Sequence, residues 1–396
     1  MWTVQELADR LTRHGQEANL RAVFDLSHRA LPPAQRRLFR LLGLHAGADF
    51  TAESAAALHH TTPERAEVLL ESLLDEHLLQ QATAGRYRMH DLLRAYARDR
   101  AQAEEPPARR RAAVHRLLTW YLHTAESART ELDPHRSRIF DLVPLRAGCM
   151  VRTFGGYDEA LAWFEAERST LREVVATAAH RAPEVAWQLP WVLLSFYYRR
   201  SHWDDWVATY EIGLAAARSL GERRGEAIMW RGLGVANSDL RRFEVALDCH
   251  RRAQALLERV GDRHGQAWNL NNAGVIHFDL GELTEAAGHF ERALLVQHGI
   301  GDQAGLRFTL STLGDLHRDN GRLGEALRHY REALATSRML ADQRITARVL
   351  AGIAETLTAD GKAEQARTYW CQALTIFDEL GDAQAESVRA KLTEIS

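Results

Sequence analysis

The chain has 396 residues, enough for two or three domains, and its 46% hydrophobic and 26% charged residues are typical of a globular protein. Its formal net charge of -3 excludes a general electrostatic attraction to nucleic acid or to an acidic membrane surface. The three cysteines, Cys149, Cys249 and Cys371, fit neither a disulfide framework nor a metal site, because they are odd in number and far apart. We therefore expect a cytoplasmic protein with reduced cysteines, without a secretory signal or a membrane-spanning segment.

Residues 1–30 are predicted to be a helical lead-in that ends at Leu31-Pro32-Pro33. Residues 31–105 then contain three helices followed by a short hairpin around Ala84-Gly85, an order that predicts a degenerate winged helix-turn-helix. A last helix leaves the wing at Asp91.

Local signals place the elements of this predicted winged helix. A turn is expected over residues 43–49, and Thr51 is expected to cap the second helix. The third helix is expected to bury one apolar face, made of Val68, Leu69, Leu73 and Leu74.

The third helix also decides whether this domain reads DNA. Between residues 64 and 76 it carries five acidic residues against Arg65 alone. The phosphate backbone, which supplies most of the affinity of DNA-binding proteins, would repel such a helix. We therefore expect DNA to be a partner only indirectly.

The triplet Met89-His90-Asp91 ends the wing, within the segment RYRMHDLLRAYARDRA. It resembles the MHD motif of NB-ARC ATPases, which lies in a winged-helix domain that closes over a bound nucleotide. The resemblance implies that His90 senses the nucleotide's terminal phosphate and that Asp91 fixes the loop. The alternative is that the two residues simply begin a helix, since Asp is a favoured cap.

Two segments, SHRALPPAQRRLFRLLGLHAGADF and the one around the MHD triplet, are similar to large actinobacterial STAND-type regulators related to the Streptomyces antibiotic regulatory protein (SARP) family. Those regulators join a DNA-binding module, an NB-ARC NTPase, a winged helix and tetratricopeptide repeats (TPRs). The chain resembles the last two parts, and residues 1–30 would then be the end of an NTPase module that precedes them.

Residues 106–180 are predicted to be a helical linker region. It begins at Pro106-Pro107 and contains a long irregular loop over residues 133–156, which is unusual in an all-helical protein. The loop is expected to be either a contact between domains or a mobile segment.

Residues 181–396 are predicted to be a right-handed TPR α-solenoid, with a degenerate repeat over 181–220, four forty-residue repeats over 221–380 and a capping helix over 381–396. In each of the four repeats, small residues recur at three positions and a bulky ring stands between two of them. The small columns are Gly234, Gly274, Gly314 and Ala354, then Ala246, Ala286, Ala326 and Ala366, then Ala253, Ala293, Ala333 and Ala373. The ring column is His250, Phe290, Tyr330 and Trp370, in which His250 departs from the pattern. This spacing resembles the TPR in a lengthened form, with a glycine such as Gly281 in left-handed conformation at the turn of a hairpin.

In TPR proteins the first helix of each hairpin lines the concave groove, so this resemblance predicts the groove residues of the chain. The predicted ligand groove contains Trp268, Asn271, Asn272, Phe278, Arg231, Ser311, Asp315 and Arg318. The amides of Asn271 and Asn272 would hydrogen-bond an extended peptide backbone, beside Trp268 and Phe278 as apolar anchors. The alternatives are a solvated surface role for the asparagines and a packing role for the aromatic residues, which is favoured for Phe278.

The sequence gives no support for a metal site, a phosphate-binding P-loop or a catalytic site. His277, His317, His289 and His329 follow the repeat, and equivalent histidines are separated by a hairpin, so no metal site is expected. The one Gly-Lys pair, Gly361-Lys362, lies in a repeat turn, so a phosphate-binding P-loop is not expected. We expect no catalytic residues, no enzyme activity and no cofactor of this chain, with ATP or ADP bound only by an upstream NTPase module.

The sequence therefore predicts an all-α protein apart from a small wing. The favoured hypothesis is the effector-sensing portion of a STAND-type transcriptional regulator of secondary metabolism. In it, the TPR groove binds a peptide, protein or small effector, and the winged helix relays that event to an NTPase module in cis or in trans. The alternative hypothesis is a free-standing TPR adaptor for protein complexes.

Overall fold

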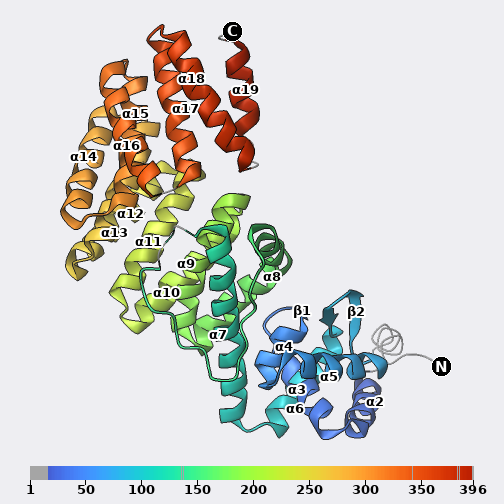
Figure 1. The fold of residues 1–396 in the computed structure, drawn as a ribbon. Helices are drawn as coiled ribbons and strands as arrows, with labels where there is room; N and C mark the ends of the chain where they lie inside the picture. Colours follow the sequence, from blue (N-terminus) through green and yellow to red (C-terminus); the bar gives the residue numbers. More distant parts are fainter. Residues whose placement is uncertain are drawn as a thin grey trace. The chain divides into compact units, whose positions relative to one another are not determined.

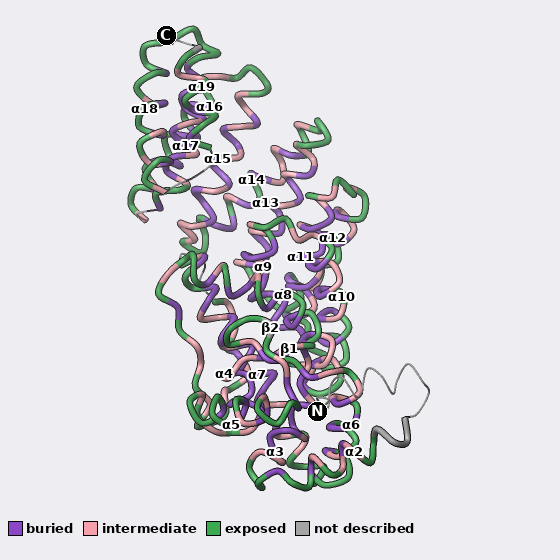
Figure 2. The backbone as a smooth tube through the Cα atoms, turned by 90° about the vertical axis from the view of Figure 1, so that its right-hand side faces the viewer, coloured by how far each residue is buried: buried purple, intermediate pink, exposed green. Residues whose placement is uncertain are grey.

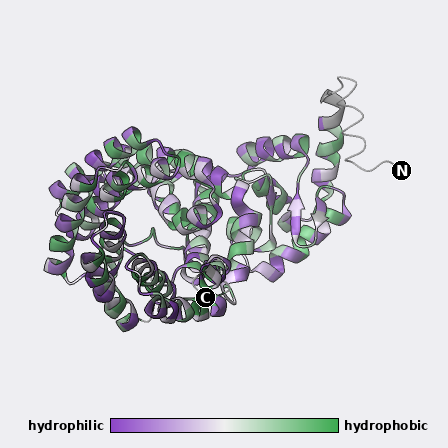
Figure 3. Cartoon of the chain, turned by 90° about the horizontal axis from the view of Figure 1, so that it is seen from above, coloured by the Kyte–Doolittle hydropathy of each residue, from purple (hydrophilic) through white to green (hydrophobic). Residues whose placement is uncertain are grey.

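The computed structural model describes residues 17–134, 136, 138–340, 342–380, 382 and 384–394. They belong to two compact units, Met1–Gly225 and Glu226–Ser396, and each unit is described here by itself (Figure 1). The part of the predicted lead-in that covers residues 1–16 lies outside the described residues, as do residues 381, 383, 395 and 396 of the predicted capping helix. The described chain is mostly helical, and most of its helices carry hydrophobic and hydrophilic residues together (Figure 3).

The amino-terminal part of the first unit combines helices with one small sheet. Its elements are α2 (Glu17–Ala30), α3 (Pro33–Leu42), β1 (Asp49–Phe50), α4 (Ala52–His59), α5 (Pro63–Asp75), β2 (Gln80–Thr83), β3 (Arg86–Arg88) and α6 (Asp91–Glu104). The sheet is antiparallel with the order β1-β3-β2, and Gly85 turns the β2–β3 hairpin with a φ of 74°. The three helices and the hairpin are present, and the winged-helix assignment stays an interpretation of them.

Two sequence expectations in this part were wrong in detail. Residues 49–50 form strand β1 beside β3, whereas the sequence predicted a turn up to Asp49. A strand of two residues is too short to show the alternation of apolar and polar residues by which strands are predicted from sequence. Val68 is 58% exposed, and the buried face of α5 consists of Ala66, Leu69, Leu70 and Leu73. The predicted cap is confirmed, since the hydroxyl of Thr51 accepts a hydrogen bond from the Ser54 amide.

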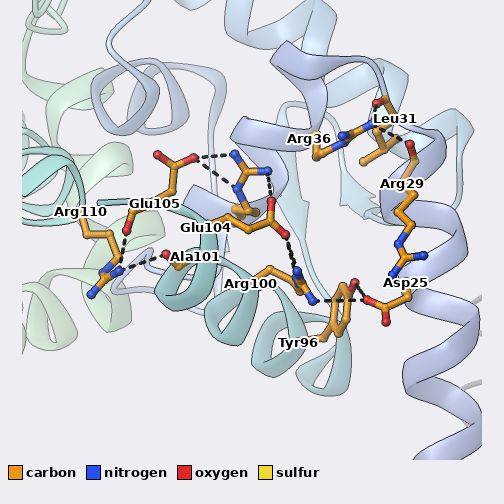
Figure 4. Close-up of polar contacts among 11 residues, drawn as sticks. Asp25, Arg29, Leu31, Arg36, Tyr96, Arg100, Ala101, Glu104, Glu105 and Arg110 are labelled. Atoms are coloured by element: carbon orange, nitrogen blue, oxygen red, sulfur yellow. Dashed lines mark hydrogen bonds and ion pairs between the residues drawn. The ribbon is translucent and has the colours of Figure 1, made fainter. Parts of the chain in front are cut away.

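A chain of polar contacts fastens α6 to its neighbours (Figure 4). Arg40 of α3 binds Glu104 at 2.8 Å and Glu105 at 2.6 Å. Arg100 binds Glu104 at 2.6 Å, and the hydroxyl of Tyr96 donates to Asp25 of α2. The middle and the carboxyl-terminal end of α6 are therefore held to α2 and α3 by polar contacts, of which the pair Arg40–Glu105 is the most buried.

The rest of the first unit consists of long helices and the predicted irregular loop. The helices are α7 (Pro107–Leu132), α8 (Tyr157–Arg181), α9 (Pro183–Arg200) and α10 (Trp203–Leu220). The pair α9 and α10 corresponds to the predicted degenerate repeat and lies in the first unit. No helix among the described residues is long and apolar enough to cross a membrane.

The loop between α7 and α8 is held by specific contacts with both α7 and α9. The indole of Trp120 donates to the Met150 carbonyl at 2.9 Å, and the Val143 amide donates to Gln188 at 2.9 Å. The guanidinium of Arg136 lies 4.0 Å from the ring centre of Trp191. Another loop contact joins His60, after α4, to the Ala147 carbonyl at 3.1 Å. Of the two alternatives left by the sequence, these contacts favour a segment that connects parts of the first unit.

The second unit is the regular repeat array. Its helices are α11 (Arg223–Asp239), α12 (Phe243–Val260), α13 (Arg263–Asp279), α14 (Leu283–Ile300), α15 (Gln303–Asp319), α16 (Leu323–Met339), α17 (Gln343–Ala359), α18 (Ala363–Glu379) and α19 (Gln384–Glu394). Buried and exposed residues alternate along each of them, as expected for helices packed on one side (Figure 2).

The predicted columns explain how the hairpins pack. Ala286 and Ala293 are fully buried on either side of Phe290, which is fully buried too. A Cβ on Gly274 would lie 2.7 Å from the Phe290 ring, so the missing side chain lets the Phe290 ring pack closely against α13. The left-handed conformation predicted for Gly281 is confirmed, with a φ of 77°.

Candidate functional site

The predicted groove residues lie on the first helix of three successive hairpins, namely α11, α13 and α15. Residues three and four apart share one face of a helix, so positions such as Trp268, Asn271 and Val275 follow one another along α13. The same positions recur forty residues later in α15 and α17. We call the surface made by these positions the first-helix face.

Three large side chains run across the first-helix face from one repeat to the next. The ring centres of Trp268 and Phe308 are 5.5 Å apart, and the guanidinium of Arg348 lies 4.8 Å from the Phe308 ring centre. All three are only partly buried. Aromatic rings at this separation attract each other, and a guanidinium over a ring adds a cation–π contribution. We call this set the Trp268–Phe308–Arg348 row; its surface is apolar at one end and cationic at the other.

A polar network lies beside this row and contains two of the predicted residues. Arg318 donates from one nitrogen to Asp315 at 3.2 Å and to Glu355 at 2.7 Å. The Tyr330 hydroxyl donates to Asp315 at 2.6 Å, and Lys391 of α19 donates to Glu355 at 2.8 Å. Burial raises the pKa of Asp315, an effect that the Tyr330 hydrogen bond and the Arg318 charge oppose. The network joins α15, α16, α17 and α19, so Asp315 and Arg318 have structural partners in addition to any ligand.

The two residues of the predicted asparagine pair differ in how far they are buried. Asn271 is fully buried, and neither atom of its amide has a hydrogen-bond partner among the described residues. Asn272 is partly buried. Asn271 therefore does not present its amide at the surface, which differs from the expectation of a peptide-binding pair. Helical spacing alone does not distinguish a surface position from one covered by the neighbouring repeats.

The remaining predicted groove residues fall into two groups. Phe278 packs against the cluster around Phe290, Leu313 and Leu316, in agreement with the packing role favoured for it. Ser311 is buried to 2% exposure, whereas Arg231 is partly buried. Among the predicted residues, Trp268 is the one that lies in the exposed row, and the structure adds Phe308 and Arg348 to it.

His90 and Asp91 lie in the first unit, at the start of α6. His90 caps the helix, since its Nδ1 accepts a hydrogen bond from the Leu92 amide at 3.3 Å, and Asp91 is the first helical residue. This local role is the alternative that the sequence left open for the MHD triplet. A nucleotide-sensing role for the two residues stays a prediction.

Stacked histidines are a feature that sequence reasoning missed. His277 stacks on His289 with ring centres 5.0 Å apart, and His317 stacks on His329 at 5.2 Å. The sequence expectation rested on each histidine and its equivalent in the next repeat. The stacked pairs form instead between the two helices of one hairpin. Within the described residues no group of three or more His, Cys, Asp or Glu side chains is placed to hold a metal ion.

A cavity of about 740 Å³ adjoins the first stacked pair and is lined by His250, His277 and His289. His250 takes the place of the larger rings of the other repeats. It is 2% exposed, its Nδ1 lies 2.8 Å from Asn269 Oδ1, and burial lowers its pKa to about 4. The histidine is therefore a neutral core residue near neutral pH.

Comparisons with known proteins agree with this architecture. Residues 223–387 match the family described as the MalT-like TPR region. The chain is 34% identical over 236 residues to the regulatory protein AfsR of Streptomyces griseus, an alignment that covers 57% of this chain and 24% of that protein. It is 37% identical over 204 residues to AfsR of Streptomyces coelicolor, covering 47% of this chain and 20% of that protein.

These matches confirm the family resemblance seen in the sequence: the repeat array is a TPR region, and the chain is related to part of AfsR. The aligned residues span at most about a quarter of the length of these relatives. A solved STAND protein with a TPR sensor from Pyrococcus horikoshii is 14% identical, with a TM-score of 0.47, and covers 95% of this chain and 54% of that chain. That likeness is too distant to support an argument about function.

Proposed function

We propose that this chain is the effector-sensing portion of a transcriptional regulator and that its first-helix face binds a peptide or protein ligand. The observation that carries the proposal is the Trp268–Phe308–Arg348 row, which leaves large apolar and cationic surface partly exposed on successive repeats. The few residues that dominate the binding energy of protein interfaces are enriched in tryptophan, tyrosine and arginine. The relationship to AfsR, a regulatory protein by name, supports a role in regulation.

The chemistry of the row suggests what the ligand contains. Trp268 and Phe308 offer apolar ring surface, and the Arg348 guanidinium, which lies over the Phe308 ring, forms no ion pair with a residue that the structure describes. A segment with an apolar side chain next to a carboxylate would satisfy both ends of the row. In the neighbouring network, the charge of Arg318 is balanced by Asp315 and Glu355. This network would therefore orient the ligand through hydrogen bonds more than attract it by net charge.

The remainder of the proposal concerns the first unit. His90 and Asp91 would contact the nucleotide of an NTPase module, supplied in cis or in trans, and that module would transmit ligand binding to a DNA-binding partner. Ligand binding has this effect only if the ligand prefers one arrangement of the modules over the other. Genomic sequence upstream of the Met1 codon tests the cis form of this proposal against the adaptor alternative, because nucleotide sensing in cis requires a P-loop module there.

A displayed library of random peptides tests the ligand-binding part. Peptides enriched on the 396-residue chain are titrated against Trp268→Ala and Arg348→Ala, and we expect the dissociation constant to rise about tenfold or more for each variant. Leu295→Ala is the matched control, because Leu295 is a large apolar side chain of α14 that is 75% exposed. The proposal fails if no peptide is enriched, or if both row variants bind like the control.

A further inference from the structure

A second cavity, of about 580 Å³, lies in the first unit between α6 and α8, beside the segment that precedes β1. Its charged and polar lining consists of Asp91, Arg94, Arg98, Ser169, Arg172 and Glu173. A volume of this size is within the range of small-molecule sites. Three arginines at one cavity set it apart from the histidine-lined cavity of the repeats.

Two of these arginines lack an acidic partner. Arg94 donates to the carbonyls of His45 at 2.6 Å and Ala46 at 3.2 Å, and Arg98 donates to the Gly43 carbonyl at 3.2 Å. Neither forms an ion pair with any residue that the structure describes. Arg100, on the same helix, instead binds Glu104 (Figure 4). The side-chain hydrogen bonds of Arg94 and Arg98 therefore go to neutral carbonyl groups.

The electrostatics of Arg94 agree with this geometry. Burial lowers the pKa of Arg94, and the positive charge of Arg98 lowers it further, while Asp91 and Glu173 oppose the shift. Asp91 and Glu173 are exposed, so solvent and salt weaken their effect. Arg98 is exposed as well, so of the two guanidinium groups it is that of Arg94 whose charge is partly desolvated and open to an anion in the cavity.

The third arginine approaches from α8 and is shared with a buried carboxylate. Arg172 Nη1 lies 3.0 Å from Asp205 Oδ1, and Arg168 Nε lies 2.5 Å from Asp205 Oδ2. The Asp205 carboxylate, which is only 4% exposed, therefore pairs with two arginines. One negative charge faces two positive charges, so this group of three side chains is positive overall. Of these two arginines, Arg172 lines the cavity.

We propose that this cavity binds the phosphate group of a small ligand, with Arg94, Arg98 and Arg172 as its donors. A guanidinium presents paired N–H groups that match two phosphate oxygens, which an ammonium does not. The site lies entirely within the first unit, so it is independent of the ligand proposed for the repeats. Its phosphate comes either from an inorganic anion or from a phosphorylated organic molecule.

Calorimetric titration of the 396-residue chain with inorganic pyrophosphate and with a nucleoside diphosphate tests the site. We expect saturable binding of both if phosphate alone is recognised, and tighter binding of the nucleotide if the rest of the cavity also contributes. Arg98→Gln and Arg172→Gln are each expected to raise the dissociation constant about tenfold, since each removes a charged donor.

Arg168→Gln is the matched control, because Arg168 shares Asp205 with Arg172 and does not line the cavity. It is expected to bind like the unchanged chain. Circular dichroism shows whether each variant is folded. If Arg98→Gln does not fold, the test depends on Arg172→Gln. Absence of saturable binding, or equal affinity in the Arg172 and Arg168 variants, would overturn the proposal.

Discussion

The two units of this chain are stabilised in different ways. In the repeats the same packing is used again and again, with Ala286 and Ala293 beside Phe290 as one example, and all three side chains are fully buried. In the first unit, single polar contacts join residues far apart in sequence, such as Arg86 with Glu167 at 2.6 Å. Repeated packing spreads stability over many equivalent contacts, whereas each contact of the first unit has no equivalent that could replace it.

The largest effect that we predict at neutral pH follows from that contrast. Glu167 is nearly fully buried and receives hydrogen bonds from Arg86 and, at 3.2 Å, from the Tyr121 hydroxyl. Arg86→Met leaves this carboxylate in the interior without its cation, and we expect the free energy of unfolding to fall by about 3 kcal/mol. Urea denaturation followed by circular dichroism measures the loss.

The pH dependence of that loss provides a second check. Burial already raises the pKa of Glu167, and removal of the Arg86 charge raises it further. The folded variant then binds a proton more readily than the unfolded chain does, so its deficit relative to the unchanged protein should narrow as the pH falls. Arg88→Met is the control, because Arg88 is exposed on the same strand and, among the described residues, its side chain bonds only to Gln80 at 2.8 Å. Equal losses in the two variants would contradict the special role of Arg86.

The second prediction concerns the one ring column position where the repeats are irregular. Burial lowers the pKa of His250 to about 4 in the folded chain, below the value of about 6.5 expected when unfolded. Between these values the unfolded chain binds more protons, so this histidine lowers stability as the pH falls, by about 3 kcal/mol over the whole interval. His250→Phe restores the ring column and should flatten the pH dependence.

The measurement is a series of denaturation curves across that pH interval for the unchanged chain and the variant. The difference between the two sets isolates His250 from other buried histidines such as His45, whose pKa burial also lowers to about 4. His298→Phe is the control, since His298 is exposed on α14. Parallel pH profiles for the unchanged chain and His250→Phe would show that the buried ring does not titrate as proposed.

The same contrast explains what the sequence could predict. Helix packing in the repeats was predictable because each small or aromatic position is repeated in four blocks and rests on local helix geometry. Strand β1, the contacts of residues 133–156 and the cavity around Arg94 were not, because they depend on individual side chains brought together over long sequence separations. Asn271 shows the limit within the repeats: its helical face could be predicted, and its complete burial by neighbouring helices could not.

The smallest predicted effect separates backbone conformation from packing inside the repeats. Gly281 turns the hairpin between α13 and α14 with a φ of 77°, and a Cβ added there would meet no atom within 4 Å. Gly281→Val should therefore cost only the backbone strain, about 1 kcal/mol or somewhat more. Gly281→Asn should cost less, because asparagine tolerates the left-handed region. If Gly281→Val leaves the thermal melt unchanged, the repeat register is refuted, because that register places a left-handed glycine at this turn.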